Sequence, residues 1–329
     1  VDTLKAVTKT LSSDAFEGRA PGSAGEEKTL AYLQQQFEKA GLKPGNKGRW
    51  LQDVPLVEIT AQAVTPLTIT GGKTPLSLAY GPDMVVGTYR VTSHIDVKDS
   101  DVVFAGYGIV APEKGWNDYA GLDVKGKTVV VLINDPDWQT QGLSGPFNGR
   151  AMTYYGRWTY KYEEAARQGA AAVLIVHQTE PAAYGWNVVQ SSNTGAAHVA
   201  DAANGHMDDT AAHGWIQLDK ARALFASAGK DFDALAAAAK VKGFKPVSLG
   251  VKASVSFDNQ IRKQISHNVV GILPGRVAPD EYVLLSAHWD HLGRCTPVNG
   301  DDICNGAVDN ADGTAALVAL AEANAKAGP

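Results

Sequence analysis

Two stretches late in the chain decide how the whole sequence is interpreted. Residues 282–293 read YVLLSAHWDHLG, and residues 306–313 read GAVDNADG. The first stretch begins with a continuous apolar run, which is typical of a strand buried on both faces, and His288 follows that run directly. The second stretch leads into residues 313–327, which have helical spacing, and we expect Asp312 to be the N-cap of this helix. A strand, a loop and a helix in this order indicate an α/β domain.

The N-terminal part of the chain has the same α/β character. Ser23 and Glu26 have the spacing of a capping box, apolar residues recur at helical intervals after them, and Gly41 is typical of a helix C-terminus. Residues 50–59 alternate enough to predict a strand, and the apolar run 268–273 predicts another. These elements and the two stretches above therefore belong to one domain.

The middle of the chain has a different sequence pattern, in which short runs of β-forming residues are separated by turn residues. A helix over 160–168, then Gly169 and the apolar run 172–176, predict a crossover helix followed by a buried strand. We expect a loop over 186–205. Two further strands are predicted at 102–106 and 128–133, and two further helices at 219–228 and 231–240.

These patterns predict an α/β fold with a central mixed β-sheet flanked by helices and an inserted β-rich domain. Residues 1–64 and 250–329 form the α/β domain in this prediction, and residues 65–249 form the insert. A chain of 329 residues is longer than one compact core usually serves, which also favours two domains.

The polar residues of the two decisive stretches have the chemistry of a metal site. If 282–287 is a strand, His288 lies at its carboxyl end, where open α/β sheets form ligand sites. An imidazole there can give one nitrogen to a metal, while Asp290 accepts a hydrogen bond from the other nitrogen. Asp309 could place a carboxylate beside the same metal, and a carboxylate can bridge two cations. A lone histidine at a strand end is usually an ordinary surface residue, so the combination with the aspartates favours the metal.

Cys295 and Cys304 are the two cysteines of the chain, and they lie in a loop rich in Gly, Asp and Asn. We expect a disulfide between them, which would require an oxidising compartment. Two alternatives stay open. One is a pair of free thiols in a cytosolic protein, and the other is a structural zinc site built from both cysteines with His288 and His291. The zinc alternative leaves the two aspartates without a role, and its cysteines are further apart than the usual spacing of about two to four residues.

Composition limits the classes of partner. The formal net charge is -5, hydrophobic residues make up 44% of the chain and charged residues 20%, which is ordinary for a soluble globular protein. We expect no nucleic-acid partner, because no basic face is needed to account for the lysines and arginines. No apolar run approaches the roughly 20 residues needed to cross a bilayer. The N-terminal residues lack the pattern of a signal peptide, so either the protein is cytosolic or a signal has been removed.

Several of these segments resemble the co-catalytic dizinc peptidases, a family that includes secreted bacterial leucine aminopeptidases, yeast aminopeptidase Y and glutamate carboxypeptidase. The middle block resembles the protease-associated domain that is inserted in many of these enzymes, through residues 104–108 and 165–170. The resemblance covers nearly the whole chain. The segments that resemble the peptidases themselves are 17–19, 21–25, 268–274, 282–293 and 306–313.

The resemblance implies roles for three residues of this chain. His288 would be the first zinc ligand, Asp290 the carboxylate that orients it, and Asp309 the ligand that bridges both zinc ions, which is often followed by a cis peptide in this family. The family also requires a Glu-Glu pair, a further acidic ligand and a final histidine, all after the helix that follows the bridging aspartate. Because the chain ends at Pro329, the resemblance implies a C-terminally truncated chain that is inactive alone, with the missing segment as its partner.

The function expected from this resemblance is that of a zinc-dependent aminopeptidase, secreted or periplasmic, that acts on peptides with two zinc ions. The alternative is a non-catalytic, receptor-like or binding homologue of the same fold, because transferrin-receptor-like relatives keep this architecture without peptidase activity. Retention of His288 and Asp309 favours the enzyme, since loss of catalysis removes the reason to keep metal ligands.

Overall fold

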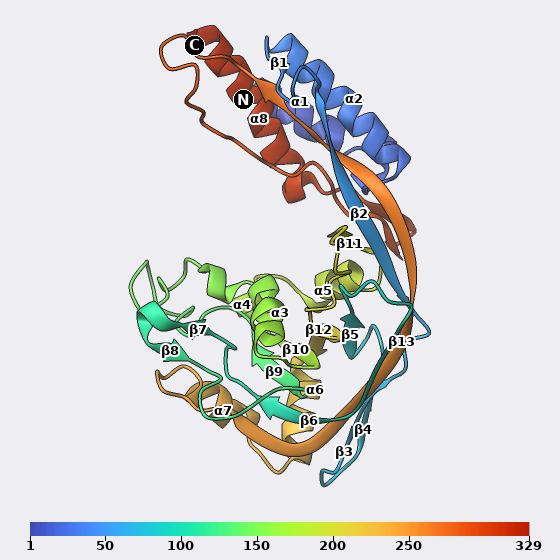
Figure 1. Cartoon of the computed structure of the whole chain (residues 1–329), viewed down its shortest axis with the longest axis vertical. Coiled ribbons are helices and arrows are strands. Elements are labelled where there is room, and N and C mark those ends of the chain that lie inside the picture. Colours follow the sequence, from blue (N-terminus) through green and yellow to red (C-terminus); the bar gives the residue numbers. More distant parts are fainter. Residues whose placement is uncertain (329) are drawn as a thin grey trace. The chain divides into compact units, whose positions relative to one another are not determined.

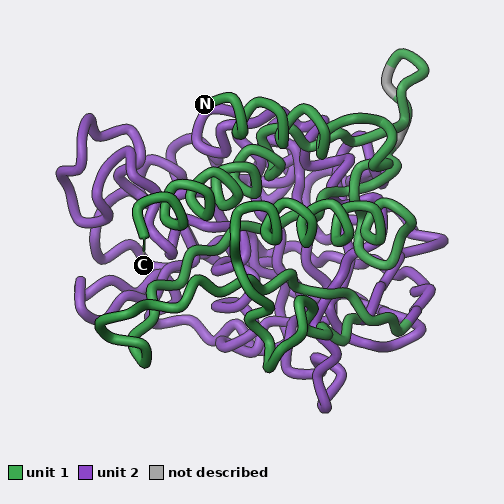
Figure 2. The backbone as a smooth tube through the Cα atoms, turned by 90° about the horizontal axis from the view of Figure 1, so that it is seen from above, with its two compact units in different colours: residues 1–56, 263–329 green, residues 57–262 purple. Residues whose placement is uncertain are grey.

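The computed structural model describes residues 1–328, which divide into two compact units (Figures 1 and 2). Unit 1 comprises Val1–Leu56 and Lys263–Pro329, and unit 2 comprises Val57–Arg262. The chain passes between the units inside two long strands, β2 (Leu51–Gln62) and β13 (Val247–Val269). Turn residues therefore do not mark the division, and the boundaries expected from the sequence, 64/65 and 249/250, lie eight and thirteen residues inside unit 2.

Unit 2 is built on a mixed β-sheet. Neighbouring strands β6, β9, β10 and β12 run parallel, while β13 pairs antiparallel with β6 and β5 pairs antiparallel with β12. Strand β3 adds to β13, and β4 adds to β3, both antiparallel. The bounds of these strands are β3 (Leu67–Thr70), β4 (Leu76–Leu78), β5 (Met84–Gly87), β6 (His94–Phe104), β9 (Thr128–Leu132), β10 (Ala172–His177) and β12 (Ala212–Gln217).

Helices cover both faces of this sheet. Because side chains alternate along a strand, Val130 and Leu132 of β9 face one core, and Val129 and Val131 face the other. Helices α6 (Leu218–Ser227) and α7 (Phe232–Ala238) contribute to the first core. Helices α3 (Trp158–Arg167), α4 (Thr179–Ala182) and α5 (Trp186–Asn193) contribute to the second.

Unit 1 is mainly helical. Helix α1 (Asp2–Leu11) and helix α2 (Ala24–Lys39) both pack against α8 (Asp312–Ala327), as Figure 1 shows. Their shared core includes Val7, Leu33, Phe37, Trp289 and Val318. Thr3 of α1 also donates a hydrogen bond of 2.7 Å to Glu322 of α8.

Short elements complete the two units. Unit 1 contains the pair β1 and β14, the hairpin β15–β16, and the short helices η1 and η4; their bounds are Lys43–Pro44, Gly271–Ile272, Gly293–Val298, Asp301–Cys304, Asp14–Arg19 and Ala307–Ala311. Unit 2 contains β7 (Val110–Ala111), η2 (Pro112–Lys114), β8 (Trp116–Asn117), η3 (Tyr154–Gly156) and β11 (Ala197–Ala200).

The predicted fold class is confirmed, since the chain is mixed α/β with a mixed sheet flanked by helices. Helix α2 has the expected ends. At its start, Ser23 accepts a hydrogen bond from the main-chain N–H of Glu26. At its end, the main-chain N–H groups of Gly41 and Leu42 donate to carbonyl oxygens in the last turn of the helix. The parallel strands belong to unit 2, however, whereas the sequence analysis placed the central sheet in the other domain.

The strand expected over Tyr282–Ala287 is wrong for this structure. Residues 282–292 have no regular structure, and Tyr282, Val283 and Leu284 are 72, 90 and 87% exposed. An apolar run shows that a segment would gain from burial, but a strand also needs a neighbouring main chain to pair with. His288 therefore follows an extended, unpaired segment instead of a buried strand.

Two smaller expectations also need correction, and one helix was missed. The segment 186–205 contains α5 and β11, so it is not a plain loop. Asp312 is the first residue of α8 and accepts the N–H of Gly313, whereas Ala311 holds the N-cap position. Helix α1 was not predicted, although its apolar residues Val7 and Leu11 have helical spacing and are buried.

Unit 2 buries one lysine completely. The Nζ of Lys161 donates hydrogen bonds to the main-chain oxygens of Tyr107 (2.6 Å) and Asn134 (3.0 Å). Burial lowers the pKa of Lys161 to about 7, although the carboxylates of Asp135 and Asp118 oppose this shift. The folded state therefore loses this proton at a much lower pH than an unfolded chain.

We predict that Lys161 makes folding stability depend on pH. An unfolded lysine keeps a pKa of about 10.4, so above pH 7 the unfolded state binds more protons and the unfolding free energy rises with pH. The difference in unfolding free energy between wild type and Lys161→Met should therefore increase by up to about 1.4 kcal/mol per pH unit between pH 7 and 9.5. Urea unfolding at several pH values measures it. Lys220, which is only partly buried and pairs with Asp83 and Asp219, supplies the control variant Lys220→Met. If the difference in unfolding free energy from wild type changed as little with pH for Lys161→Met as for Lys220→Met, the prediction would be contradicted.

Candidate metal centre

His288, Asp290 and Asp309 lie together in unit 1. The Nε2 atom of His288 is 3.2 Å from Oδ1 of Asp309. The Nδ1 atom of His288 lies 3.1 Å from the main-chain oxygen of Asp290 and 3.3 Å from its Oδ1. The side chains of His288 and Asp309 are 53 and 70% exposed. A ring nitrogen and a carboxylate oxygen therefore face each other where solvent and ions can reach them.

Acceptor oxygens lie next to both ring nitrogens of His288. The two atoms of Asp290 near Nδ1 are oxygens, which can accept a hydrogen bond from a protonated Nδ1. With a metal ion at Nε2, Nδ1 would carry the proton and Asp290 would accept it as a hydrogen bond. This arrangement of a histidine with an acceptor behind it is typical of metal-binding histidines.

Tertiary contacts hold His288 in place, because its segment lacks regular structure. Thr314 of α8 donates a hydrogen bond of 2.9 Å from its hydroxyl to the main-chain oxygen of His288. The next residue, Trp289, is buried in the core of unit 1, and its indole donates to the main-chain oxygen of His267 in β13 (3.0 Å). Each side of the histidine is thus tied to a regular element.

Asp309 lies in η4, directly before α8, and the peptide bond between Asp309 and Asn310 is cis. The turn begins at Gly306, which has a φ of 58°. A Cβ atom on Gly306 would lie 2.4 Å from the main-chain oxygen of Asp309 and 2.6 Å from the ring of His291. Glycine is therefore required at position 306 by both the backbone conformation and the available space.

Arg19 is a part of this centre that the sequence analysis missed. In the sequence it stands out only as part of segment 17–19 of the resemblance, whereas the structure buries it completely. Its guanidinium donates to the main-chain oxygens of Trp289, Asn305 and Gly306, which flank the two ligand candidates. Burial lowers the pKa of Arg19, while the carboxylates of Asp290 and Asp309 oppose this shift. An isolated arginine has no periodicity, so no local signal could have shown its burial.

The disulfide between Cys295 and Cys304 is confirmed. It joins the two strands of the hairpin β15–β16. A disulfide has no thiolate to bind a metal, so both alternatives, the free thiols and the structural zinc site with His288 and His291, are wrong. His291 instead lies largely buried with its Nδ1 3.8 Å from Oδ2 of Asp309, and burial lowers the pKa of its ring.

The donor types of this centre suit zinc, since imidazole nitrogen and carboxylate oxygen are both ordinary zinc ligands. The number of donors is smaller than one zinc ion needs. Within residues 1–328, His, Cys, Asp and Glu side chains form no group of three or more that could hold a metal ion. His288 and Asp309 therefore do not by themselves complete the coordination sphere of a zinc ion.

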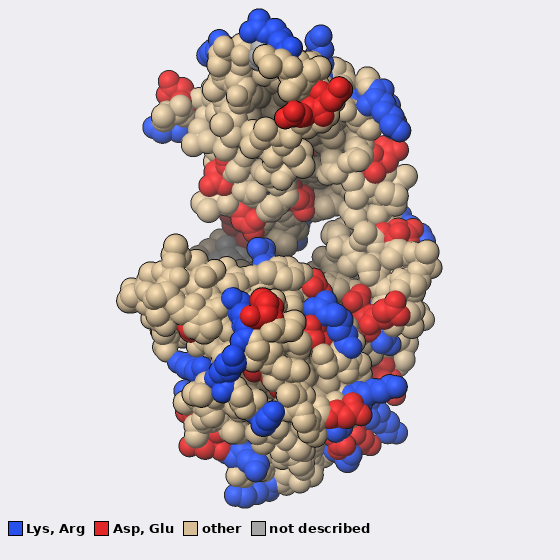
Figure 3. All heavy atoms as spheres, turned by 60° about the vertical axis from the view of Figure 1, so that its left-hand side comes forward, with Lys and Arg blue, Asp and Glu red and all other residues tan. Residues whose placement is uncertain are grey.

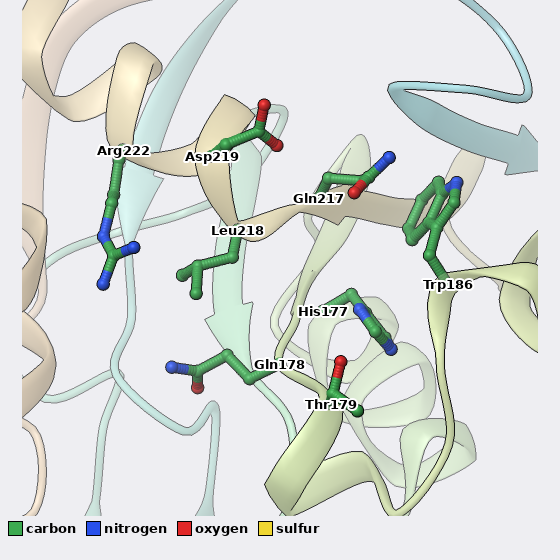
Figure 4. A pocket seen from close by; sticks show the side chains of 8 residues that line it. All are labelled: His177, Gln178, Thr179, Trp186, Gln217, Leu218, Asp219 and Arg222. Carbon is green, nitrogen blue, oxygen red and sulfur yellow. The ribbon is translucent and has the colours of Figure 1, made fainter.

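A second polar site lies in unit 2, well away in sequence from these residues. A cavity of about 310 Å³ opens at the carboxyl ends of the neighbouring strands β10 and β12 (Figure 4). The chain leaves β10 toward one face of the sheet and leaves β12 toward the other. Ligands of open α/β sheets commonly bind at such positions. The cavity is lined by His177, Gln178, Thr179, Trp186, Gln217, Leu218, Asp219 and Arg222.

Two surface properties bear on possible partners. On the face drawn in Figure 3, lysine and arginine side chains are interspersed with aspartate and glutamate side chains. The net charge of -5 is therefore not gathered at one place on this face. Among the helices of residues 1–328, none is both long and apolar enough to span a membrane.

Residues 268–329 match the family model described as Peptidase family M28. This stretch contains His288, Asp290 and Asp309. The resemblance to this class of peptidases is therefore confirmed over the segment that carries the candidate centre. No curated protein matches the chain at a significant level.

Solved structures also show similarity to the chain. The aminopeptidase from Aneurinibacillus sp. strain AM-1 is 20% identical with a TM-score of 0.45, covering 99% of this chain and 59% of that one. The zinc aminopeptidase BSAP from Bacillus subtilis is 15% identical with a TM-score of 0.39, covering 98% and 56%. A peptidase M28 precursor from Shewanella amazonensis SB2B is 13% identical with a TM-score of 0.41, covering 98% and 63%. The chain thus spans less than two thirds of each of these proteins.

We predict that the disulfide stabilises unit 1 without being needed for its fold. The bond closes a short loop, because its cysteines are nine positions apart, and a loop of this size stabilises by about 2–3 kcal/mol in the chain-entropy model. The variant Cys295→Ser/Cys304→Ser should lose about that much unfolding free energy in urea. Thiol titration of the unreduced, denatured wild type should find no reactive thiol, and two reactive thiols would refute the bridge.

Proposed function

We propose that this chain is part of a zinc-dependent aminopeptidase that releases N-terminal residues from peptides. The family match over residues 268–329 supports a peptidase. One observation carries the proposal further: within that matched segment, Nε2 of His288 and Oδ1 of Asp309 face each other at 3.2 Å. A nitrogen lone pair and a carboxylate in this arrangement are suited to share one metal ion.

The residues of this chain have distinct roles in the proposal. Asp290 would accept a hydrogen bond from the Nδ1–H of His288, which would leave the lone pair of Nε2 for a metal ion. The two carboxylate oxygens of Asp309 point in different directions, one toward His288 and the other toward His291. Each oxygen could therefore bind a separate metal ion. Bound zinc would supply a water of lowered pKa and polarise the scissile carbonyl. The complete site would hold two ions, as the family resemblance implies.

The remaining groups of the site are proposed to come from outside the described residues. Two donors do not fill the coordination sphere of zinc, and a general base is typically worth about 10²–10⁴ in rate. We assign both the further ligands and a glutamate base to a segment of the same protein that is not part of the sequence printed here. The exposed apolar residues Val283 and Leu284 are suited to pack against such a segment.

We assign unit 2 a role in substrate access or partner binding, as a protease-associated domain. The three candidate residues all belong to unit 1, while the cavity at β10 and β12 offers unit 2 a place for a small polar ligand or peptide end. We also propose that the protein is exported to the periplasm or the medium. The disulfide supports this location, because such bonds persist in oxidising compartments.

We predict that the protein expressed from its complete gene binds zinc through His288. The variant His288→Ala should lose at least half of the bound zinc, measured by elemental analysis after dialysis, and should hydrolyse a leucyl chromogenic amide at less than about 1% of the wild-type rate, given the size of metal-ion catalysis. The control is His94→Ala, because His94 is another exposed histidine paired with an aspartate, at 2.7 Å from Asp258.

The outcomes separate the candidate functions. Equal zinc content in wild type and His288→Ala would remove the assignment of this residue. Zinc binding without hydrolysis of aminoacyl substrates would favour the alternative, a binding homologue that keeps the fold without catalysis.

A further inference from the structure

We infer that Arg19 is a positioning residue for the proposed zinc centre: its buried guanidinium holds the His288 segment and the Asp309 loop at the separation that lets both bind one metal. The inference rests on the proposed function, since it concerns the geometry of that centre. The hydrogen bonds of the Arg19 guanidinium go to main-chain oxygens, so Arg19 acts through the main chain.

Arg19 bonds to both segments at the same time. Its Nε donates to the main-chain oxygen of Trp289 (2.8 Å), one residue after His288. Its Nη1 and Nη2 donate to the main-chain oxygens of Asn305 (2.7 Å) and Gly306 (2.9 Å), which begin the turn that carries Asp309. The planar guanidinium therefore sets the distance between two stretches of main chain.

The backbone of Arg19 adds a further tie to the first segment. The main-chain N–H of His291 donates to the main-chain oxygen of Arg19 at 3.2 Å. Trp289 and His291 are thus both bound by the same residue, on either side of Asp290. Nη1 also donates to the main-chain oxygen of Leu11, at the end of α1, which links the cluster to the helical core.

The need for this tie follows from the lack of regular structure around His288. Residues 282–292 form no strand or helix, so no sheet ladder fixes the register of the histidine. The Asp309 loop is held partly by α8 but starts at Gly306, next to Arg19. Without the guanidinium, the carbonyls of Trp289, Asn305 and Gly306 would lose their charged donor, and each segment could shift independently.

Lysine cannot replace this geometry. A guanidinium presents five N–H donors in a rigid plane, whereas an ammonium group is a compact point charge on a flexible stem. Arg19→Lys keeps the positive charge near Asp290 and Asp309 and removes the planar fork. This substitution therefore separates the positioning role from a purely electrostatic one.

The test uses the metal-free protein expressed from its complete gene, with zinc alone as the probe. Zinc affinity is measured by competition with a chromogenic chelator for wild type, Arg19→Lys and Arg19→Met. Residues that orient metal ligands typically contribute about 10–100-fold to affinity, so both variants should bind zinc at least about 10-fold more weakly. The absorption spectrum of the cobalt-substituted protein should change as well, because it reports ligand geometry.

The matched control is Arg90→Lys in unit 2. Arg90 also donates from Nε and Nη2 to a main-chain oxygen, that of Asp209 at 2.8 and 2.6 Å. Its replacement should lower the unfolding midpoint of the metal-free protein without changing zinc affinity or the cobalt spectrum. This control shows how far the loss of an arginine that only stabilises the fold changes zinc affinity and the cobalt spectrum.

A third substitution covers the case in which Arg19→Lys and Arg19→Met do not fold. Arg19→Gln replaces the guanidinium by a neutral amide with a single NH2 group, so it buries no charge and cannot bond to both segments as the three guanidinium nitrogens do; it should also weaken zinc binding. Folded Arg19→Lys or Arg19→Gln with wild-type affinity and spectrum would overturn the inference. If the wild type itself binds no zinc, the proposed function fails first, and the inference fails with it.

Discussion

The interaction on which unit 1 depends is the contact between the buried guanidinium of Arg19 and main-chain carbonyls. A charge in a protein interior is costly unless hydrogen bonds compensate it. Here the compensation comes from Leu11, Trp289, Asn305 and Gly306, which belong to parts of the chain up to 287 positions away from Arg19. The same bonds that satisfy the charge also bring the first residues of the chain to the segments that carry the candidate ligands.

This constraint gives a physical meaning to the short segment Glu17-Gly18-Arg19. A Cβ on Gly18 would lie 2.4 Å from the main-chain oxygen of Gly293 and 2.6 Å from that of Cys304. Glycine therefore allows η1 to approach the disulfide-bonded hairpin, and the next residue directs its guanidinium to the carbonyls on either side of that hairpin. Glu17 remains at the surface, where it pairs with Lys28 of α2. Glu17 thus forms a surface ion pair, Gly18 allows two stretches of main chain to come close together, and Arg19 provides the buried charge.

The two units divide the chemistry of the chain. Unit 1 places an imidazole, two carboxylates and a disulfide on and around loops, and its candidate ligands are more than half exposed. Unit 2 buries Lys161 fully and has a cavity at the ends of two parallel strands. Loops positioned on helices leave polar side chains accessible to solvent, whereas a sheet covered on both faces forms a buried core.

The sequence by itself determined the elements whose signals are local. The capped ends of α2 and the glycine after α3 depend on residues within a few positions of one another, and the alternating cores of β9 and β10 follow from strand periodicity. It also indicated which residue types could meet at the centre, namely His288, Asp290 and Asp309. Only the tertiary structure decided that 282–287 is unpaired, that the parallel strands belong to unit 2, and that Arg19 lies buried between the ligand segments. These features depend on contacts between distant parts of the chain, and a pattern of neighbouring residues contains no information on which distant partner is present.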